Sequence, residues 1–391
     1  MAAADKALCA FPKWAQYLVI ALTLVVILMQ CITQVPTGQM NISDVQERHG
    51  QFGAEDYADT YEAKVVINDP WDMYTKEHLD QTKKEHNTWS KEASSPYPPI
   101  CLLAIAGLYL FGEYTGLGFY GTVLLLVVAF MSMSVFYFLK TRWYLFPILY
   151  LNFTFLAKRF FYSQNTSYLL LFCVVMIALL LARKGNKACH PLMALAVDIK
   201  FMPVYYVKNL LKMRWYIAAI FVAVLLAGLV LPYFIWDNYL YIYTFQGTRG
   251  TLAHQWESWV IAGAFSLLLW YVETRMKFDD EDKIGWSMVP FGMFMMIRCD
   301  IFRTMIMMCI IPDKRGWRNV VAAIGLTLGP IMMDTHKYYH TVQWICLPLP
   351  FLVMLYYLVR IGWKRIWADL RHPLRTAKAM LVGERGKKES C

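Results

Sequence analysis

The sequence predicts an all-α polytopic membrane protein with about 10 to 12 spanning or re-entrant helices and a long first extracytoplasmic loop. Three observations lead to this prediction. The 391 residues are 58% hydrophobic. Only 17% are charged, against about 25% in a typical soluble domain. Many apolar runs also approach the roughly 20 residues that a helix needs to cross a hydrocarbon core of about 30 Å.

The distribution of charge fits the same class. The formal net charge of +10 lies mainly in short segments between apolar runs. Membrane proteins carry such segments on the cytoplasmic side, so we expect no nucleic acid as a partner. The clusters expected in the cytoplasm are 183–187, 212–214, 314–318 and the basic tail 360–391.

The N-terminal elements follow from composition. The first apolar run, 14–31, comes after Lys6 and Lys13 and has no cleavage site of small residues. We therefore expect a retained anchor and a cytoplasmic N-terminus. Residues 35–96 are polar and too short for a core of their own, so we expect an extracytoplasmic loop with short surface helices.

The remaining apolar runs complete a single transmembrane domain over residues 1–359, before the basic cytoplasmic tail 360–391. In chain order the runs are 98–112, 117–139, 143–157, 166–182, 216–234, 258–272, 284–311, 318–333 and 341–359. Pro98 and Pro99 fit the first turn of the helix that follows them, where a missing N–H loses no helical hydrogen bond.

A weaker apolar stretch, 188–211, lies between two segments expected in the cytoplasm. It is too short for two full spans. We therefore expect a re-entrant pair of half-helices there, because irregular backbone at membrane depth needs protein or water around it. The run 284–311 is likewise interrupted, by Arg298, Asp300 and Arg303.

Several familiar catalytic signatures are absent from the sequence. It contains no GxxxxGK[ST] phosphate loop, no GxSxG elbow and no HExxH zinc helix, which disfavours an ATP-driven transporter. The nine cysteines form no CxxC pair. We interpret most of them as small buried apolar residues and assign no metal site.

An acidic segment stands in the first polar loop. Asp56 and Asp59 are three residues apart, so a helix would place both on one face. They could form a solvated surface helix or supply a carboxylate general base. Further along, Asp69-Pro70-Trp71 indicates a turn.

Polar residues near the later apolar runs give further candidates. Gln164 and Asn165 precede the run 166–182 and fit either interfacial capping or hydrogen bonding to a sugar. His336 and His340 are four residues apart. Their spacing suits a metal on a helix, interfacial packing or sugar contact.

Charged residues inside apolar segments need compensation. Lys200 could snorkel, pair within the protein, for example with Asp198, or bind an anionic lipid phosphate. Arg298 and Arg303 could pair with Asp300 or bind phosphate through their planar guanidinium groups.

The order of these motifs resembles the membrane glycosyltransferases of family 87 in the GT-C superfamily, which are similar to mannosyltransferases that use polyprenyl-phosphate-mannose. The matching residues are Asp56-Tyr57, Tyr61, Ala63, Asp69-Pro70-Trp71, Tyr97-Pro98-Pro99, Ser163-Gln164-Asn165, Ala196, Lys200, Pro203, Lys212-Met213-Arg214-Trp215, Tyr339-His340 and Pro348. The serine replaces a glycine, the late Trp-x-His-His core is degenerate, and 235–315 matches none of the motifs.

The resemblance implies a GT-C-like bundle and an inverting sugar transfer from a polyprenyl-phosphate donor to an extracytoplasmic glycan or glycolipid. It implies Asp56 as the general base. The donor phosphate would be bound by Lys200, Arg298 and Arg303. Contacts to the acceptor or the sugar would come from Asp59, Tyr61, Gln164, Asn165, His336 and His340. No cofactor is required, although a divalent metal is compatible with the site.

The expected location is the bacterial inner membrane, with both termini in the cytoplasm and membrane lipids around the helices. Two other functions stay open. A lipid or solute transporter or flippase would use intramembrane charges and broken helices to line its path. A non-catalytic subunit of a membrane complex would need no catalytic residues.

Overall fold

The computed structural model describes most of the chain. The described residues are 8–35, 59–71, 73–74, 98–157, 160–161, 166–236, 239, 256–291, 311–321, 323–324 and 348–382. Every regular element among them is a helix, and none is a strand. The predicted all-α class is therefore confirmed.

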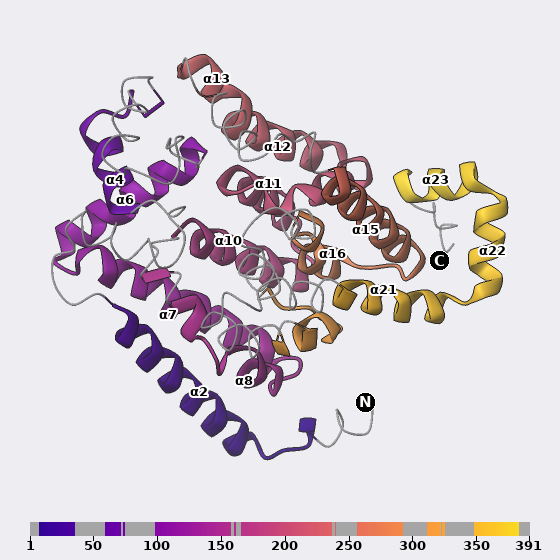
Figure 1. The fold of residues 1–391 in the computed structure, drawn as a ribbon, viewed down its shortest axis with the longest axis horizontal. Helices are drawn as coiled ribbons and strands as arrows, with labels where there is room; N and C mark the ends of the chain where they lie inside the picture. Colours follow the sequence, from indigo (N-terminus) through magenta and orange to yellow (C-terminus); the bar gives the residue numbers. More distant parts are fainter. Residues whose placement is uncertain are drawn as a thin grey trace. The chain divides into compact units, whose positions relative to one another are not determined.

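Four helices among the described residues are long and apolar enough to cross a membrane (Figure 1). They are α2 (Lys13–Gln34), α7 (Gly118–Leu139), α10 (Thr166–Arg183) and the continuous helix Trp215–Ile235, which joins α12 (Trp215–Leu225), η3 (Leu226–Val230) and α13 (Leu231–Ile235). Their 18 to 22 residues extend about 27 to 33 Å at 1.5 Å per residue, which matches the hydrocarbon core. These four helices confirm an α-helical membrane protein, while the total number of spans stays a prediction.

Other apolar runs form helices close to their predicted bounds. Helix α6 (Pro99–Thr115) has Pro98 as its N-cap and Pro99 in its first turn, as the proline pair predicts. The run expected at 258–272 lies within α15 (Trp256–Arg275), and the run expected at 341–359 overlaps α21 (Pro348–Ile361).

The run 143–157 is broken into two short helices, α8 (Leu145–Tyr150) and α9 (Thr154–Ala157). The side chain of Gln30 in α2 lies at the break. Its Nε2 donates to the carbonyl of Leu151 at 3.0 Å, and its Oε1 accepts from the amide of Phe153 at 2.8 Å. Because an unpaired backbone group in an apolar environment is costly, this one amide stabilises the interruption.

The weaker stretch 188–211 also forms two short helices. Helix α11 (Cys189–Ile199) is followed by the 3₁₀ helix η2 (Met202–Lys212), in which Pro203 has a non-helical backbone with φ −84° and ψ 16°. The pair of short helices agrees with the sequence, and its depth in the membrane stays a prediction. The run 284–311 starts within α16 (Asp280–Trp286), but its interrupting charges lie outside the described residues.

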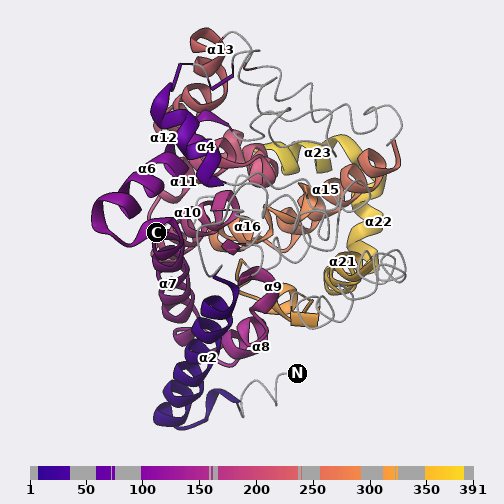
Figure 2. The same cartoon turned by 60° about the vertical axis from the view of Figure 1, so that its left-hand side comes forward.

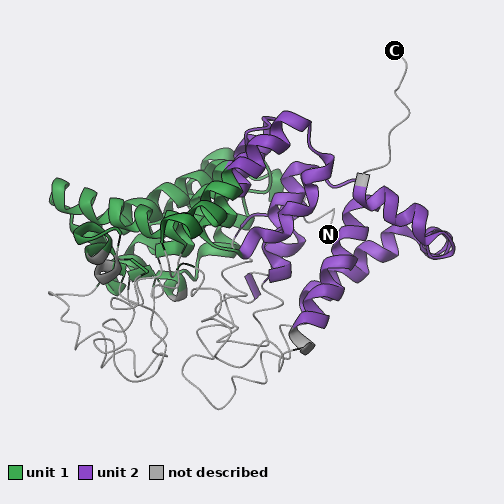
Figure 3. Cartoon of the chain, turned by 90° about the horizontal axis from the view of Figure 1, so that it is seen from above, with its two compact units in different colours: residues 1–177, 195–201, 224–254 green, residues 178–194, 202–223, 255–391 purple. Residues whose placement is uncertain are grey.

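The chain divides into two compact units, coloured separately in Figure 3. Unit 1 contains 1–177, 195–201 and 224–254, and unit 2 contains 178–194, 202–223 and 255–391. Helices α10, α11 and α12 each begin in one unit and end in the other.

In unit 1, helix α4 (Asp59–Asn68) packs along α6, and α6 packs against α7 (Figure 1). The turn between α6 and α7 requires glycine. Gly116 has φ +71°, and a Cβ on Gly112 would lie 2.5 Å from the carbonyl oxygen of Gly118. Figure 2 shows α2 beside α8 and α9, which it contacts.

In unit 2, helix α15 packs against α21 and α23 (Pro373–Val382). The indole of Trp270 donates to the carbonyl of Met380 at 2.9 Å. Arg275 forms an ion pair of 2.6 Å with Asp369 in α22 (Trp363–Arg371). The basic tail is therefore helical as far as Val382 and is attached to α15.

Candidate functional site

The first candidate group lies in unit 1, at the N-terminus of α10. Asp59, the first residue of α4, is fully buried. Its Oδ2 accepts a hydrogen bond of 2.7 Å from the backbone N–H of Thr166, the first residue of α10. The first N–H groups of a helix have no helical partner and carry partial positive charge. A carboxylate from the first polar loop therefore caps a predicted membrane span 107 residues away.

Lys200 reaches the next residues of the same helix. Its Nζ donates to the hydroxyl of Ser167 at 3.1 Å and lies 3.4 Å from the centroid of the Tyr168 ring. Both of these groups are uncharged, and the face of the tyrosine ring attracts the ammonium group. Asp59 and Lys200, two residues that the sequence assigned to the site, thus contact consecutive residues of α10.

Asp198 does not form the hydrogen bond to Lys200 that was one explanation for the intramembrane lysine. It is fully buried, and neither of its carboxylate oxygens has a hydrogen-bond partner among the described residues. Its carboxyl group instead lies against Gly228, where an added Cβ would fall 2.2 Å from its carboxyl carbon. Lys200 follows the last residue of α11 and contacts Ser167 and Tyr168, whereas Asp198 contacts Gly228.

The turn predicted at residues 69–71 is present in unit 1. The amide of Trp71 donates to Oδ1 of Asp69 at 3.2 Å, which is an Asx-type turn. The indole of Trp236 donates to the carbonyl of Pro70 at 2.9 Å. The turn is therefore attached to the end of the helix Trp215–Ile235.

The other predicted site residues are not placed by the structure. Tyr61 belongs to α4, and only its helical backbone is described. The residues outside the described part of the chain are Asp56, Gln164, Asn165, Arg298, Arg303, His336 and His340. Their assigned roles stay predictions.

A second polar group lies in unit 2 and was not predicted. Its acidic residues are Asp279, the N-cap of α16, and Asp280, Glu281 and Asp282, the first three residues of that helix. They pair with basic residues of two segments expected in the cytoplasm. The pairs are Arg183–Glu281 at 3.2 Å, Lys187–Asp280 at 2.7 Å, Arg315–Asp282 at 3.2 Å and Lys314–Asp279. The unbroken acidic run 279–282 was the signal in the sequence that could have indicated this group. Basic loops expected on one side of the membrane need acidic partners on the same side.

Burial and neighbouring charges act in opposite directions on these carboxyl groups. Burial alone would raise the pKa of Asp280, but the hydrogen bond from Lys187 and nearby positive charges, including Lys283, bring it below its ordinary value. For Asp282 burial prevails over the attraction of Arg315 and raises its pKa to about 6.

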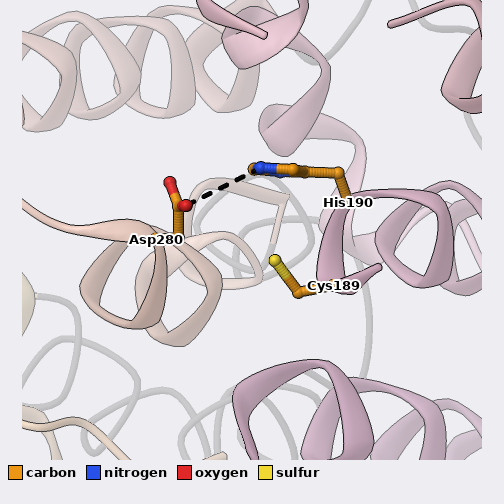
Figure 4. A group of neighbouring side chains, drawn as sticks. All are labelled: Cys189, His190 and Asp280. Carbon is orange, nitrogen blue, oxygen red and sulfur yellow. Dashed lines mark ion pairs between the residues drawn. The ribbon is translucent and has the colours of Figure 1, made fainter. Parts of the chain in front are cut away.

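Three side chains of types that bind metals meet beside this network (Figure 4). Their potential ligand atoms, from Cys189, His190 and Asp280, all lie within 4.8 Å of one another. Asp280 follows the two α11 residues by about 90 positions, so no short motif could reveal the group.

Comparisons with models of protein families, with curated proteins and with solved structures gave no match to this chain.

Proposed function

We propose that this protein is a membrane glycosyltransferase that moves a hexose or pentose from a polyprenyl-phosphate donor to an extracytoplasmic glycan or glycolipid. One observation carries the proposal. Asp59 and Lys200 contact the consecutive residues Thr166 and Ser167, directly after the predicted sugar-binding pair Gln164-Asn165. Two residues that the sequence assigned to one site, Asp59 and Lys200, therefore meet at the start of α10.

This helix end has the chemistry that a lipid phosphate requires. Lys200 supplies a positive charge beside the hydroxyl of Ser167, and that hydroxyl is a further hydrogen-bond donor. The N-terminus of a helix also favours an anion. Arg298 and Arg303 are the additional phosphate ligands in this proposal.

The reaction follows from these roles. Asp56 takes the proton of an acceptor hydroxyl. The hydroxyl oxygen forms a bond to the anomeric carbon of the sugar, while the bond from that carbon to the phosphate oxygen breaks. The electron pair leaves with the polyprenyl phosphate, and Lys200 stabilises its developing charge. No cofactor takes part.

In this proposal the acceptor is contacted by the residues that the sequence assigned to it. Asp59 accepts a hydrogen bond from the first residue of α10, and its proposed role is contact with the acceptor. The other proposed contacts are Tyr61, Gln164, Asn165, His336 and His340. The reaction takes place outside the cytoplasm of a bacterial inner membrane, and both termini lie inside.

A transporter is the second candidate, and Asp198 is the observation that favours it. A buried carboxyl group with no hydrogen-bond partner in the described part of the chain, beside the π-helix Leu226–Val230, is typical of ion pathways with broken helices. The first polar loop and its attachment to α10 favour the transferase, because a transporter has no need of them.

The test is a transfer assay on the purified protein with a panel of lipid-linked sugars. A charge-assisted contact contributes about 1.5–3 kcal/mol, so Lys200→Ala should weaken donor binding about tenfold or more. Lys140→Ala is the matched control, because Lys140 also lies over an aromatic ring, that of Phe136, but is exposed. Unchanged donor affinity in the Lys200 variant would reduce Lys200 to a structural role. Absence of transfer with every donor, together with uptake of a solute into proteoliposomes, would favour the transporter.

A further inference from the structure

We infer that Cys189, His190 and Asp280 form a binding site for a zinc ion in unit 2. The first two residues open α11, and Asp280 is the first residue of α16. Figure 4 shows the three side chains directed toward a common space between these helix ends. The inference does not depend on the proposed sugar transfer, because the residues at the N-terminus of α10 have no part in it.

The separations suit tetrahedral zinc. Bonds of about 2.0–2.3 Å to nitrogen, oxygen and sulfur place neighbouring ligands about 3.3–3.8 Å apart. The Nε2 of His190 lies 3.7 Å from Oδ2 of Asp280. All three ligand atoms lie within 4.8 Å of one another, so side-chain movements of about 1 Å complete the geometry and leave a fourth position for water.

The histidine is already oriented for this role. Its Nδ1 lies 2.8 Å from the hydroxyl of Tyr206, which is fully buried. With a proton on Nδ1 donated to that hydroxyl, Nε2 keeps its lone pair toward Asp280. Metal-binding histidines are commonly fixed in this way through the other ring nitrogen.

Two lysines contact Asp280, and the one at its Oδ2, Lys187, can be displaced by a metal ion. Lys187 lies 2.7 Å from the same Oδ2, but its side chain is 55% exposed. Exposed ion pairs contribute little, so Lys187 can turn into water when a metal takes that oxygen. Lys283 lies 3.6 Å from Oδ1 and can stay.

The mixture of donors selects the metal. Thiol, imidazole and carboxylate together suit Zn²⁺, whereas Mg²⁺ and Ca²⁺ prefer oxygen ligands alone. On binding, the thiol of Cys189 loses its proton to solvent. The resulting thiolate and the Asp280 carboxylate balance the two positive charges of the ion.

The test uses the full chain, purified in detergent through a tag without histidine and dialysed against zinc alone. One equivalent of zinc per chain is expected. Cobalt substituted for zinc should give a thiolate-to-cobalt charge-transfer band. Cys189→Ser should lose this band and weaken zinc binding about tenfold or more. Cys173→Ser, a change at a buried cysteine of α10, should alter neither.

A second variant tests the site without removing a ligand. Lys187→Met deletes the competing cation at an exposed position, so the affinity for zinc should rise about two- to fivefold. Absence of zinc in the wild-type chain would overturn the inference. It would equally be overturned if Cys189→Ser kept the cobalt band, or if Lys187→Met left the affinity unchanged.

Discussion

Oδ2 of Asp59 lies 2.7 Å from the backbone nitrogen of Thr166. This hydrogen bond joins the first polar loop to the start of a predicted membrane span, and Lys200 contacts the adjacent Ser167. One helix end therefore gathers residues from three distant parts of the sequence.

Asp59→Ala should destabilise the protein by about 1.5–3 kcal/mol, because a buried charge-assisted hydrogen bond is lost and the Thr166 N–H loses its partner. Thermal unfolding in detergent measures the effect. Asp69→Ala is the control, since Asp69 also accepts from a backbone N–H but is exposed. Equal losses in the two variants would contradict a special role for the Asp59 contact.

Gly228→Ala should destabilise the protein by about 1–3 kcal/mol through overpacking, because the new methyl group would fall 2.2 Å from the carboxyl carbon of Asp198. Adding Asp198→Ala should recover most of the loss. Gly107→Ala is the control, since no atom lies within 4 Å of its added Cβ and alanine favours a helix by about 0.5–1 kcal/mol. If both glycine variants unfolded at the same temperature, the proposed steric conflict would be wrong.

Lys208 and Glu273 form a buried ion pair in unit 2, with side chains 8% and 3% exposed. Lys208→Met should cost about 3–5 kcal/mol, because it leaves a buried carboxylate without its partner. The double variant Lys208→Met, Glu273→Leu should recover most of this. The exposed pair Lys314–Asp279 provides the comparison, and Lys314→Met should cost at most about 1 kcal/mol. Additive losses in the double variant would argue against coupling of the two charges.

Asp56→Asn keeps the shape of the side chain and removes its basicity. It should abolish sugar transfer without unfolding the protein or preventing donor binding, because a general base contributes about 10²–10⁴-fold. Glu55 and Asp59 are other carboxylates of the same acidic segment, so Glu55→Gln and Asp59→Asn are compared in the same assay. If Asp56→Asn stays active while one companion is inactive, the base lies elsewhere in the loop. If all three are active, the loop is not catalytic.

The predicted topology places residues 35–96 outside and the tail inside. Cysteines introduced at Gln51 and Glu384, with Cys9 and Cys391 changed to serine, should react differently with a membrane-impermeant maleimide in intact cells. Gln51 should be labelled and Glu384 protected. Labelling of both positions from the same side would reverse the assignment.

The sequence by itself determined the helical class, the membrane environment and several helix ends. Long apolar runs gave α2, α7, α10 and the helix Trp215–Ile235, because a span depends on local composition and length. Local chemistry also determined the helix start at Pro99 and the turn at Asp69, since proline and aspartate act on their own backbone.

Tertiary structure alone decided which polar side chains meet. Gln30 pairs with the backbone at the break between α8 and α9, and Asp59 reaches Thr166 across 107 residues. The same holds for the approach of Asp280 to His190. A local sequence pattern shows which segments are apolar and how long they are. It does not show which residues of two distant segments lie side by side. The packing of the helices determines which residues lie side by side, and therefore which partner each buried charge has.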